Sequence, residues 1–196
     1  MGRPKTLVLV DDHDTFMTRL VRTLREGGVD DVVVVVSADG PVEEIKVALA
    51  TVPPEPRVVV NPDPSRGQLS SLLVGLGAID RPGVAAVLMT LVDVPLVSPG
   101  TVSSLLDVYA ATRSPIVRPT RLDDESHGHP VIFDRALFGE LRQASFETGA
   151  KAVVRAHEAE IANVPVDDDG AFLDIDTPAD YQRIFGRPLP DDIGPH

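Results

Sequence analysis

The alternation of short apolar runs with amphipathic segments is the feature that most limits what this chain can fold into. The runs at residues 31–37, 57–61 and 84–92 do not alternate with polar residues, as is typical of strands buried on both faces. Segments with helical spacing, such as residues 15–26 and 69–79, separate them. Repeated β–α units favour a mostly parallel sheet with helices on both faces. We therefore predict an α/β fold with residues 84–92, the longest apolar segment, in the middle of the sheet.

The remaining elements are shorter and are marked by capping residues. Ser98 is expected to cap a helix that runs to residue 110, and Thr177 with Pro178 is expected to begin a closing helix. The other predicted elements are strands at residues 115–119, 130–133 and 161–166 and helices at residues 41–50, 135–143 and 149–157.

Charge and composition exclude several classes of function. The chain has 196 residues, with 18 lysines and arginines against 30 acids and a formal net charge of −12. Such acidity argues against sequence-independent binding to nucleic acid. The absence of cysteine removes disulfides, thiolate zinc sites and cysteine nucleophiles and favours a reducing compartment. No apolar run reaches the roughly 18 residues of a membrane span, so we expect a cytoplasmic protein without a membrane partner.

Carboxylates at the end of one predicted element and the start of another are candidates for chemistry. Asp93 stands where the longest apolar segment ends, and residues 174–178, Asp-Ile-Asp-Thr-Pro, offer a second carboxylate, at Asp176, before the closing helix. Ligands of open α/β sheets bind at the carboxyl edge of the strands, and two converging carboxylates suit Mg²⁺. The structural alternative is that Asp93 forms a turn and that Asp176 or Thr177 caps a helix.

Two polar loops are further candidates. Asn61 and the segment at residues 67–72 join a strand end to a helix start, where backbone amides and two hydroxyls can meet a polar ligand. Residues 127–130 read His-Gly-His-Pro and suit a loop that orients a substrate. The structural alternative for Asn61 and residues 67–72 is a loop with a helix N-cap. For residues 127–130 it is an ordinary turn. A zinc site at the two histidines is disfavoured, because no third ligand has matching spacing.

The acids near the start of the chain suggest another possibility. Residues 7–13, Leu-Val-Leu-Val-Asp-Asp-His, resemble the start of a response-regulator receiver domain, whose paired acids hold magnesium. Such a domain needs a phosphorylated aspartate at the end of a later strand, but residues 52–54 are Val-Pro-Pro and the nearest strand ends in Asn61. We therefore favour a polar turn in which Asp11, Asp12 and Asp14 precede a helix.

Five sequence motifs follow one another along the chain: MGRPK at residues 1–5, GQLSSL at residues 67–72, DVPL at residues 93–96, HGHP at residues 127–130 and LDIDTPADY at residues 173–181. Taken in this order, they resemble the MobA-like nucleotidyltransferases, most closely their molybdenum cofactor cytidylyltransferase branch. The resemblance implies a Rossmann-like, three-layer nucleotidyltransferase fold. The chain length fits one domain, over residues 1–186, and the prolines and acids of residues 187–196 predict a flexible tail.

The resemblance also implies a reaction. A member of this branch transfers CMP from CTP, or GMP from GTP in guanylyltransferase relatives, to the terminal phosphate of molybdopterin and releases pyrophosphate. Lys5 and Asp93 would be catalytic, and Asp93 and Asp176 would hold Mg²⁺. The implied nucleotide-binding residues are Lys5, Asn61, Gly67, Ser70, Ser71, Asp93 and Pro95, and the implied acceptor-binding residues are His127, Gly128 and His129. A molybdoenzyme or its chaperone is the implied protein partner.

The chain departs from the family pattern at its beginning. Members begin with a strand and a glycine-rich loop before the part that matches Met1 and Gly2, so we expect an N-terminally incomplete domain. Residues 126–128, Ser-His-Gly, are a second departure, because many members carry arginine before the glycine. Because the missing loop supplies amides that cradle the triphosphate, the alternative function is a non-catalytic nucleotide- or pterin-binding module.

Overall fold

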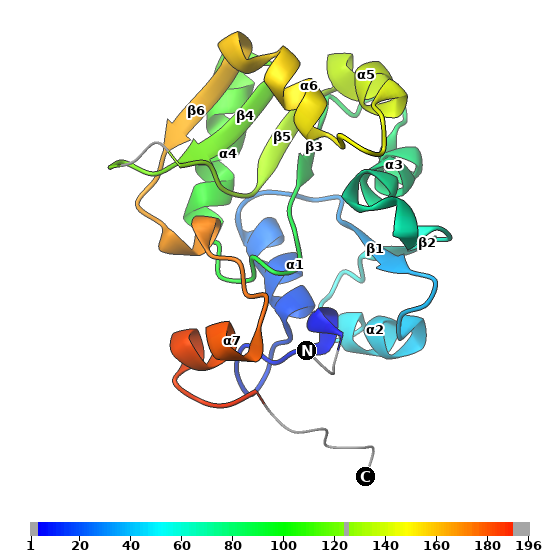
Figure 1. Ribbon diagram of the computed structural model, residues 1–196, viewed down its shortest axis with the longest axis vertical. Helices are drawn as coiled ribbons and strands as arrows, with labels where there is room; N and C mark the ends of the chain where they lie inside the picture. Colours follow the sequence, from blue (N-terminus) through cyan, green and yellow to red (C-terminus); the bar gives the residue numbers. More distant parts are fainter. Residues whose placement is uncertain (1–3, 124–125, 190–196) are drawn as a thin grey trace.

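The computed structural model describes residues 4–123 and 126–189, whose strands form two sheets. In the smaller sheet, β1 (Val33–Ser37) pairs in parallel with β2 (Arg57–Asn61). The larger sheet has the order β3-β5-β4-β6 (Figure 1). Its strands are β3 (Ala86–Met89), β4 (Ile116–Thr120), β5 (Val131–Asp134) and β6 (Ile161–Pro165).

The helices confirm the predicted α/β alternation. The α-helices are α1 (Phe16–Glu26), α2 (Val42–Leu49), α3 (Gln68–Ile79), α4 (Pro99–Thr112), α5 (Phe138–Gln143), α6 (Lys151–Ala156) and α7 (Pro178–Phe185). Short 3₁₀ turns lie at Lys5–Leu7, Pro64–Arg66, Arg135–Leu137, Glu158–Glu160 and Asp169–Phe172. Ser98 and Thr177 cap α4 and α7 as predicted, each accepting a hydrogen bond from the backbone three residues on.

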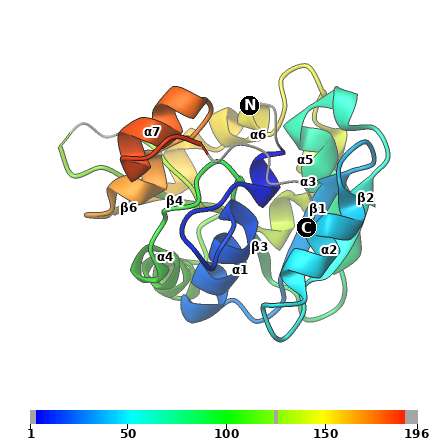
Figure 2. The same cartoon turned by 90° about the horizontal axis from the view of Figure 1, so that it is seen from below.

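The elements form three layers (Figures 1 and 2). On one face of the strands, α1 and α4 pack together, and Val102 of α4 joins the apolar cluster that contains Val36 of β1. On the other face, α3, α5 and α6 cover β4 and β5 around Ile116 and Phe133. α7 packs apart from both layers, against Val8 and Phe16. The three-layer arrangement predicted for the chain is confirmed.

The strands are mostly parallel, as predicted, with one exception. β5 runs antiparallel to both β3 and β4, whereas β4 and β6 are parallel. β3, β4 and β6 therefore share one direction. Because β5 returns against them, residues 126–130, which lead into β5, lie at the same edge as the carboxyl ends of β3 and β4.

The prediction that residues 84–92 lie in the middle of one sheet is wrong. β3 contains only Ala86–Met89 and stands at the edge of the larger sheet. Its ladder to β5 ends at Val131, and the next residue back, Pro130, has no backbone N–H to continue it. Likewise β1, whose apolar run is typical of a strand buried on both faces, has one partner strand within the described residues.

The start of the described chain forms a turn, which fits the prediction for the acids there and not a receiver domain. Leu9 makes a single bridge to Thr15 and belongs to neither sheet. Asp11 accepts hydrogen bonds from the backbone of His13 and Asp14, and Arg19 and Arg22 of α1 pair with these acids.

The predicted tail lies partly inside the described chain. Arg187 donates to the carbonyl of Val10 at 3.1 Å, and Leu189 packs near Ile175 and Tyr181. Residues 190–196 and residues 1–3 lie outside the described residues. No helix in the described chain combines the length and apolarity needed to cross a membrane.

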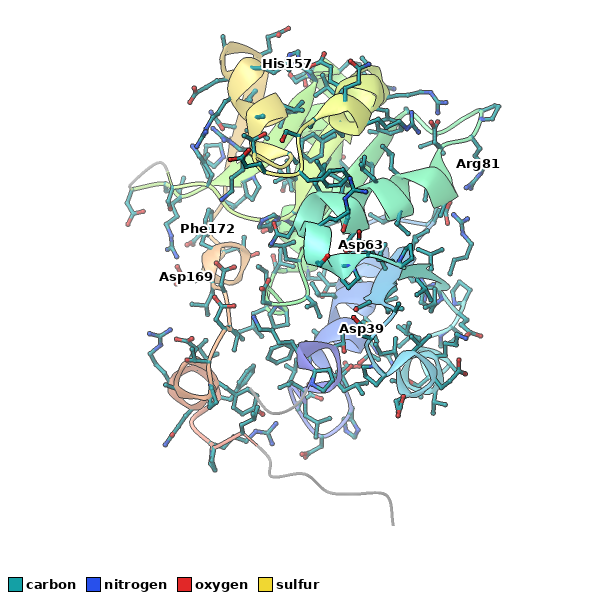
Figure 3. The ribbon with its side chains drawn as sticks, turned by 45° about the vertical axis from the view of Figure 1, so that its right-hand side comes forward. Asp39, Asp63, Arg81, His157, Asp169 and Phe172 are labelled. Carbon is teal, nitrogen blue, oxygen red and sulfur yellow. The ribbon has the colours of Figure 1, made fainter. Side chains whose placement is uncertain are left out.

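A histidine joins three elements at the end of the molecule opposite α7 (Figures 1 and 3). His157, which follows α6, lies 2.9 Å from a carboxylate oxygen of Glu140 in α5 and 3.0 Å from one of Glu160. These hydrogen bonds raise the pKa of His157 above its ordinary value of 6.5. The protonated imidazole therefore stabilises the folded state.

We expect His157→Gln to lower stability in a pH-dependent way. Because the folded-state pKa is raised, the contribution is complete below pH 6.5 and is lost as the pH rises through the folded-state pKa. Urea unfolding at pH 5.5 should show a loss of up to about 1 kcal/mol, typical of exposed ion pairs, and at pH 9 almost none. An equal loss at both pH values in His157→Gln would contradict the assignment.

Candidate active site

Asp93 is fixed where the chain leaves β3 and turns toward α4. The turn is anchored by Val94 and Val97, whose side chains are buried. The carbonyl of Asp93 accepts a hydrogen bond of 2.8 Å from the amide of Ile175, 82 positions later in the sequence. This bond brings the predicted closing motif beside the predicted catalytic aspartate.

The closing motif presents two carboxylates from one extended stretch. Ile175 is fully buried against Val8 and Tyr181, whereas Asp174 and Asp176 on either side of it are exposed. Since alternate residues of an extended segment point the same way, burial of Ile175 turns both acids toward solvent. Tyr181 of α7 secures the arrangement by donating a hydrogen bond to the carbonyl of Leu9 at 2.8 Å.

Lys5 connects the two predicted metal-binding acids. Its Nζ lies 3.4 Å from Oδ2 of Asp93 and also donates to Oδ1 of Asp176. The 3₁₀ turn Lys5–Leu7 leads into Val8 and Val10, which are buried beside Ile175 and position the lysine. The structure therefore brings together the three residues at which catalysis and metal binding were predicted.

The electrostatics of the site reflect an excess of negative charge. Partial burial opposes the charged form of Lys5, but Asp176 and Asp93 outweigh it, so the pKa of Lys5 is raised. Partial burial and the charges of Asp93 and Asp176 raise the pKa of Asp174. Burial lowers the pKa of His129, although Asp174, the Met89 backbone and Asp93 act in the opposite direction. Lys5 is thus the main permanent cation among three carboxylates.

This charge balance fits a bound divalent cation. Asp93 has one buried carboxylate oxygen, Oδ1, with no hydrogen-bond partner within the described chain. Oxygen donors of this kind suit Mg²⁺ or Mn²⁺, which take a few carboxylates and complete their shell with water or substrate phosphate. No group of three or more histidine or acidic side chains is placed to hold a metal by itself among residues 4–123 and 126–189. The site therefore fits a metal ion held jointly by protein carboxylates and by water or substrate phosphate. The described residues do not form a zinc site made of protein ligands alone.

Four of the predicted nucleotide contacts form one internal network at the end of β2. Asn61 is 1% exposed and donates to the hydroxyls of Ser70 at 2.8 Å and Ser71 at 3.0 Å. Ser70 in turn donates to the carbonyl of Gly67, the residue before α3. The described hydrogen bonds of Asn61 and Ser70 hold this loop in shape, whereas Ser71 is only partly buried.

The loop at β2 lies on the carboxyl side of its sheet. Asp39, after β1, and Asp63, after β2, lie on the same side of the molecule (Figure 3). Gly67 has a φ of 80° and a ψ of −171°, a conformation that only glycine adopts readily, and a side chain added there would meet open space. Backbone conformation therefore explains this glycine.

The His-Gly-His-Pro loop divides its two histidines between different surroundings. His129 interacts electrostatically with Asp93 and Asp174, whereas His127 lines a separate cavity with residues of β4 and α6. Between them, Gly128 lies against the carbonyl of Ala171, which also accepts a hydrogen bond of 2.8 Å from the His129 amide. Of the predicted acceptor-binding residues, only His129 is thus brought to the Asp93 site by a described interaction.

Pro95 was predicted as a nucleotide contact, whereas Asp168 and Asp174 were not predicted as site residues. Pro95 is buried and lines a cavity of about 350 Å³ beside α1. Sequence reasoning did not select Asp174 as a site residue, although its alternation with Ile175 and Asp176 was a readable signal. It also missed Asp168, which accepts hydrogen bonds from the Ser98 amide at 2.8 Å and the Thr101 hydroxyl at 2.6 Å. No local sequence pattern predicts that contact, because it joins segments about 70 residues apart.

We expect Asp93→Asn to shift the titration of its neighbours in the metal-free protein. Because the Asp93 charge raises the pKa of both Asp174 and His129, its removal should lower both values. Asp176→Asn should lower the pKa of Asp174 but leave that of His129 almost unchanged. NMR titration of the Asp174 carboxyl carbon and the His129 ring measures this, and unmoved values in Asp93→Asn would contradict the site.

We expect Gly128→Ala to destabilise the fold. An added Cβ would lie 2.2 Å from the carbonyl oxygen of Ala171, so backbone must move, at a cost of about 1–3 kcal/mol. Urea unfolding measures the loss. Gly139→Ala in α5 is the matched control: its Cβ meets open space and should leave stability equal or slightly higher.

Comparison with known proteins gives one family and a consistent fold. Residues 1–161 match the MobA-like NTP transferase domain. None of the curated proteins compared with the chain matches it. Among solved structures, Rv0371c from Mycobacterium tuberculosis is 29% identical, with a TM-score of 0.80 over 95% of this chain and 91% of that one. Rv0371c in complex with manganese gives a TM-score of 0.75 over 95% and 94%, again at 29% identity.

More distant structures share the fold. The synthetase for CMP:2-keto-3-deoxy-manno-octonic acid, complexed with CTP, is 12% identical with a TM-score of 0.70 over 94% of this chain and 92% of that one. Molybdopterin-guanine dinucleotide biosynthesis protein A from Archaeoglobus fulgidus is 16% identical, with a TM-score of 0.62 over 93% and 89%. The predicted Rossmann-like nucleotidyltransferase fold is confirmed. With the family match spanning most of its length, the chain belongs to the MobA-like NTP transferase family.

Proposed function

We propose that this chain, as a single domain over residues 1–186, is a metal-dependent cytidylyltransferase. It transfers CMP from CTP to the terminal phosphate of molybdopterin and releases pyrophosphate. The observation that carries the proposal is the convergence of Lys5, Asp93 and Asp176, from three distant parts of the sequence, at one point. The family match and the ordered motifs supply the reaction class.

The reaction sets the charge problem that these residues address. The attacking phosphate oxygen and the α-phosphate of the nucleotide are both anionic, so catalysis depends on positioning and charge neutralisation. The raised pKa of Lys5 keeps its ammonium group charged at neutral pH, as contact with a triphosphate requires. No covalent protein nucleophile is needed.

Asp93 and Asp176 are the residues that would hold the divalent cation, with Mg²⁺ as the proposed ion. A bound cation supplies neutralisation of phosphate charge at the reacting centre. The orphaned Oδ1 of Asp93 and the excess of carboxylates support this assignment. The manganese complex of Rv0371c supports a divalent metal in a relative. Lys5, which lies beside both carboxylates, is the residue that would contact the triphosphate.

The remaining predicted contacts divide between donor and acceptor. We assign the nucleoside of CTP to Gly67, Ser71 and Pro95, with Asn61 and Ser70 holding the loop in shape. The acceptor phosphate is assigned to the loop of Gly128 and His129, whose Nδ1 is buried and has no hydrogen-bond partner within the described chain. The structure in complex with CTP supports a cytidine nucleotide in this fold, and GTP is the alternative donor. The product would pass to a molybdoenzyme or its chaperone.

The test is pyrophosphate release with each of the four ribonucleoside triphosphates, molybdopterin and Mg²⁺. We expect CTP to be preferred, and Asp93→Ala to lower kcat/KM by about a hundredfold or more, as is typical when charge stabilisation is removed. Asp107→Ala, an exposed acid of α4, is the matched control and should retain full activity.

The result also separates the alternatives. Preference for GTP would replace the cytidylyltransferase by a guanylyltransferase. Tight CTP binding without pyrophosphate release, unaffected by Asp93→Ala, would indicate a binding module that does not catalyse transfer. Full activity in Asp93→Ala would overturn the proposed role of this residue.

A further inference from the structure

A second cavity, apart from the Asp93 site, lies between the larger sheet and α6. It has a volume of about 200 Å³ and is lined by Arg118, His127, Lys151, Val154, Arg155 and Glu158. α6 is fixed over the sheet because Val153 packs in the apolar cluster that contains Ile116 of β4. None of Lys5, Asp93, Asp174 or Asp176 lines it.

The cavity is lined by cations that form no salt bridge within the described residues. Most lysines and arginines of this acidic chain form salt bridges. Within residues 4–123 and 126–189, those without a salt bridge are Arg25, Arg113, Arg118, Lys151 and Arg155, and the last three line this cavity. Since like charges in one place are unfavourable without a counter-ion, the grouping indicates a site for an anion.

The arrangement of Arg118 supports the same conclusion. Its Nε donates to Oδ1 of Asn163 in β6 at 2.9 Å, which orients the guanidinium group. Burial lowers the pKa of Arg118, and Glu158 opposes that effect. The other N–H groups of Arg118 have no hydrogen-bond partner among the described residues and remain available for a ligand.

We propose that this cavity binds the phosphate group of a small molecule. Three permanent cations and one carboxylate leave two positive charges, which match a dianionic phosphate better than a carboxylate. Arginine forks suit phosphate oxygens geometrically, and Lys151 adds a point charge. At about 200 Å³ the cavity holds a phosphate group and not a whole nucleotide, for which pockets are larger. The site does not depend on nucleotidyl transfer or on a metal.

The test is titration of the full chain, without metal or nucleotide, with inorganic phosphate and with glycerol phosphate at constant ionic strength. Binding is followed by NMR signals of the His127 ring and the Arg118 Nε–H. We expect both ligands to move these signals and acetate to bind much more weakly. Arg155→Gln and Lys151→Gln, both exposed side chains, should weaken phosphate binding about tenfold each while leaving the urea midpoint unchanged.

Lys46→Gln is the matched control, because this exposed lysine of α2 pairs only with Glu43 among the described residues. It should bind phosphate as the wild type does. Equal weakening in all three variants would show general electrostatic attraction and overturn the proposal. Phosphate that leaves His127 and Arg118 unmoved would also overturn it. Because no triphosphate is present, these outcomes do not depend on whether the chain is a cytidylyltransferase.

Discussion

The hydrogen bond from the Ile175 amide to the Asp93 carbonyl is the contact on which the site depends. It joins the turn after β3 to the segment before α7 at 2.8 Å, and the buried side chain of Ile175 fixes the orientation of its neighbours. Val8 and Tyr181 enclose that side chain, so the same cluster places Lys5. Lys5 and the two acids are therefore positioned by apolar packing around one isoleucine.

Charge is distributed unevenly in this molecule, and that matters more than its net value. Around Asp93 three carboxylates face one permanent cation, whereas around Arg118 three cations face one carboxylate. Elsewhere acids and bases are mostly paired, as Asp80 is with Arg135 and Arg142. The two unbalanced places are the ones where we propose ligands, a cation at the first and a phosphate at the second. The overall acidity argues against nucleic acid but does not describe either pocket.

The sequence predictions were correct where a feature depends on neighbouring residues and failed where it depends on residues far apart in the sequence. The bounds of β2 and the caps Ser98 and Thr177 were predicted correctly, because they depend on residues within one turn or strand. The length of β3 and its position in the sheet were predicted wrongly. A strand extends only as far as its partner strand can pair with it, and Pro130 ends the pairing of β5 with β3. For the site, the positions of Asp93 and Asp176 could be predicted as strand-end and helix-start acids, but their shared contact with Lys5 could not.

By itself the sequence determined the α/β class, the helix starts and the family motifs, since periodicity, capping and short motifs act locally. Only the tertiary structure decided which acids meet, because Asp93 and Asp176 are brought together by a backbone bond and buried packing between segments far apart. It also decided that His127 and His129, two residues apart, lie in different surroundings, since Gly128 between them is held against Ala171. Close approach of this kind depends on the whole fold and leaves no periodic pattern in the chain.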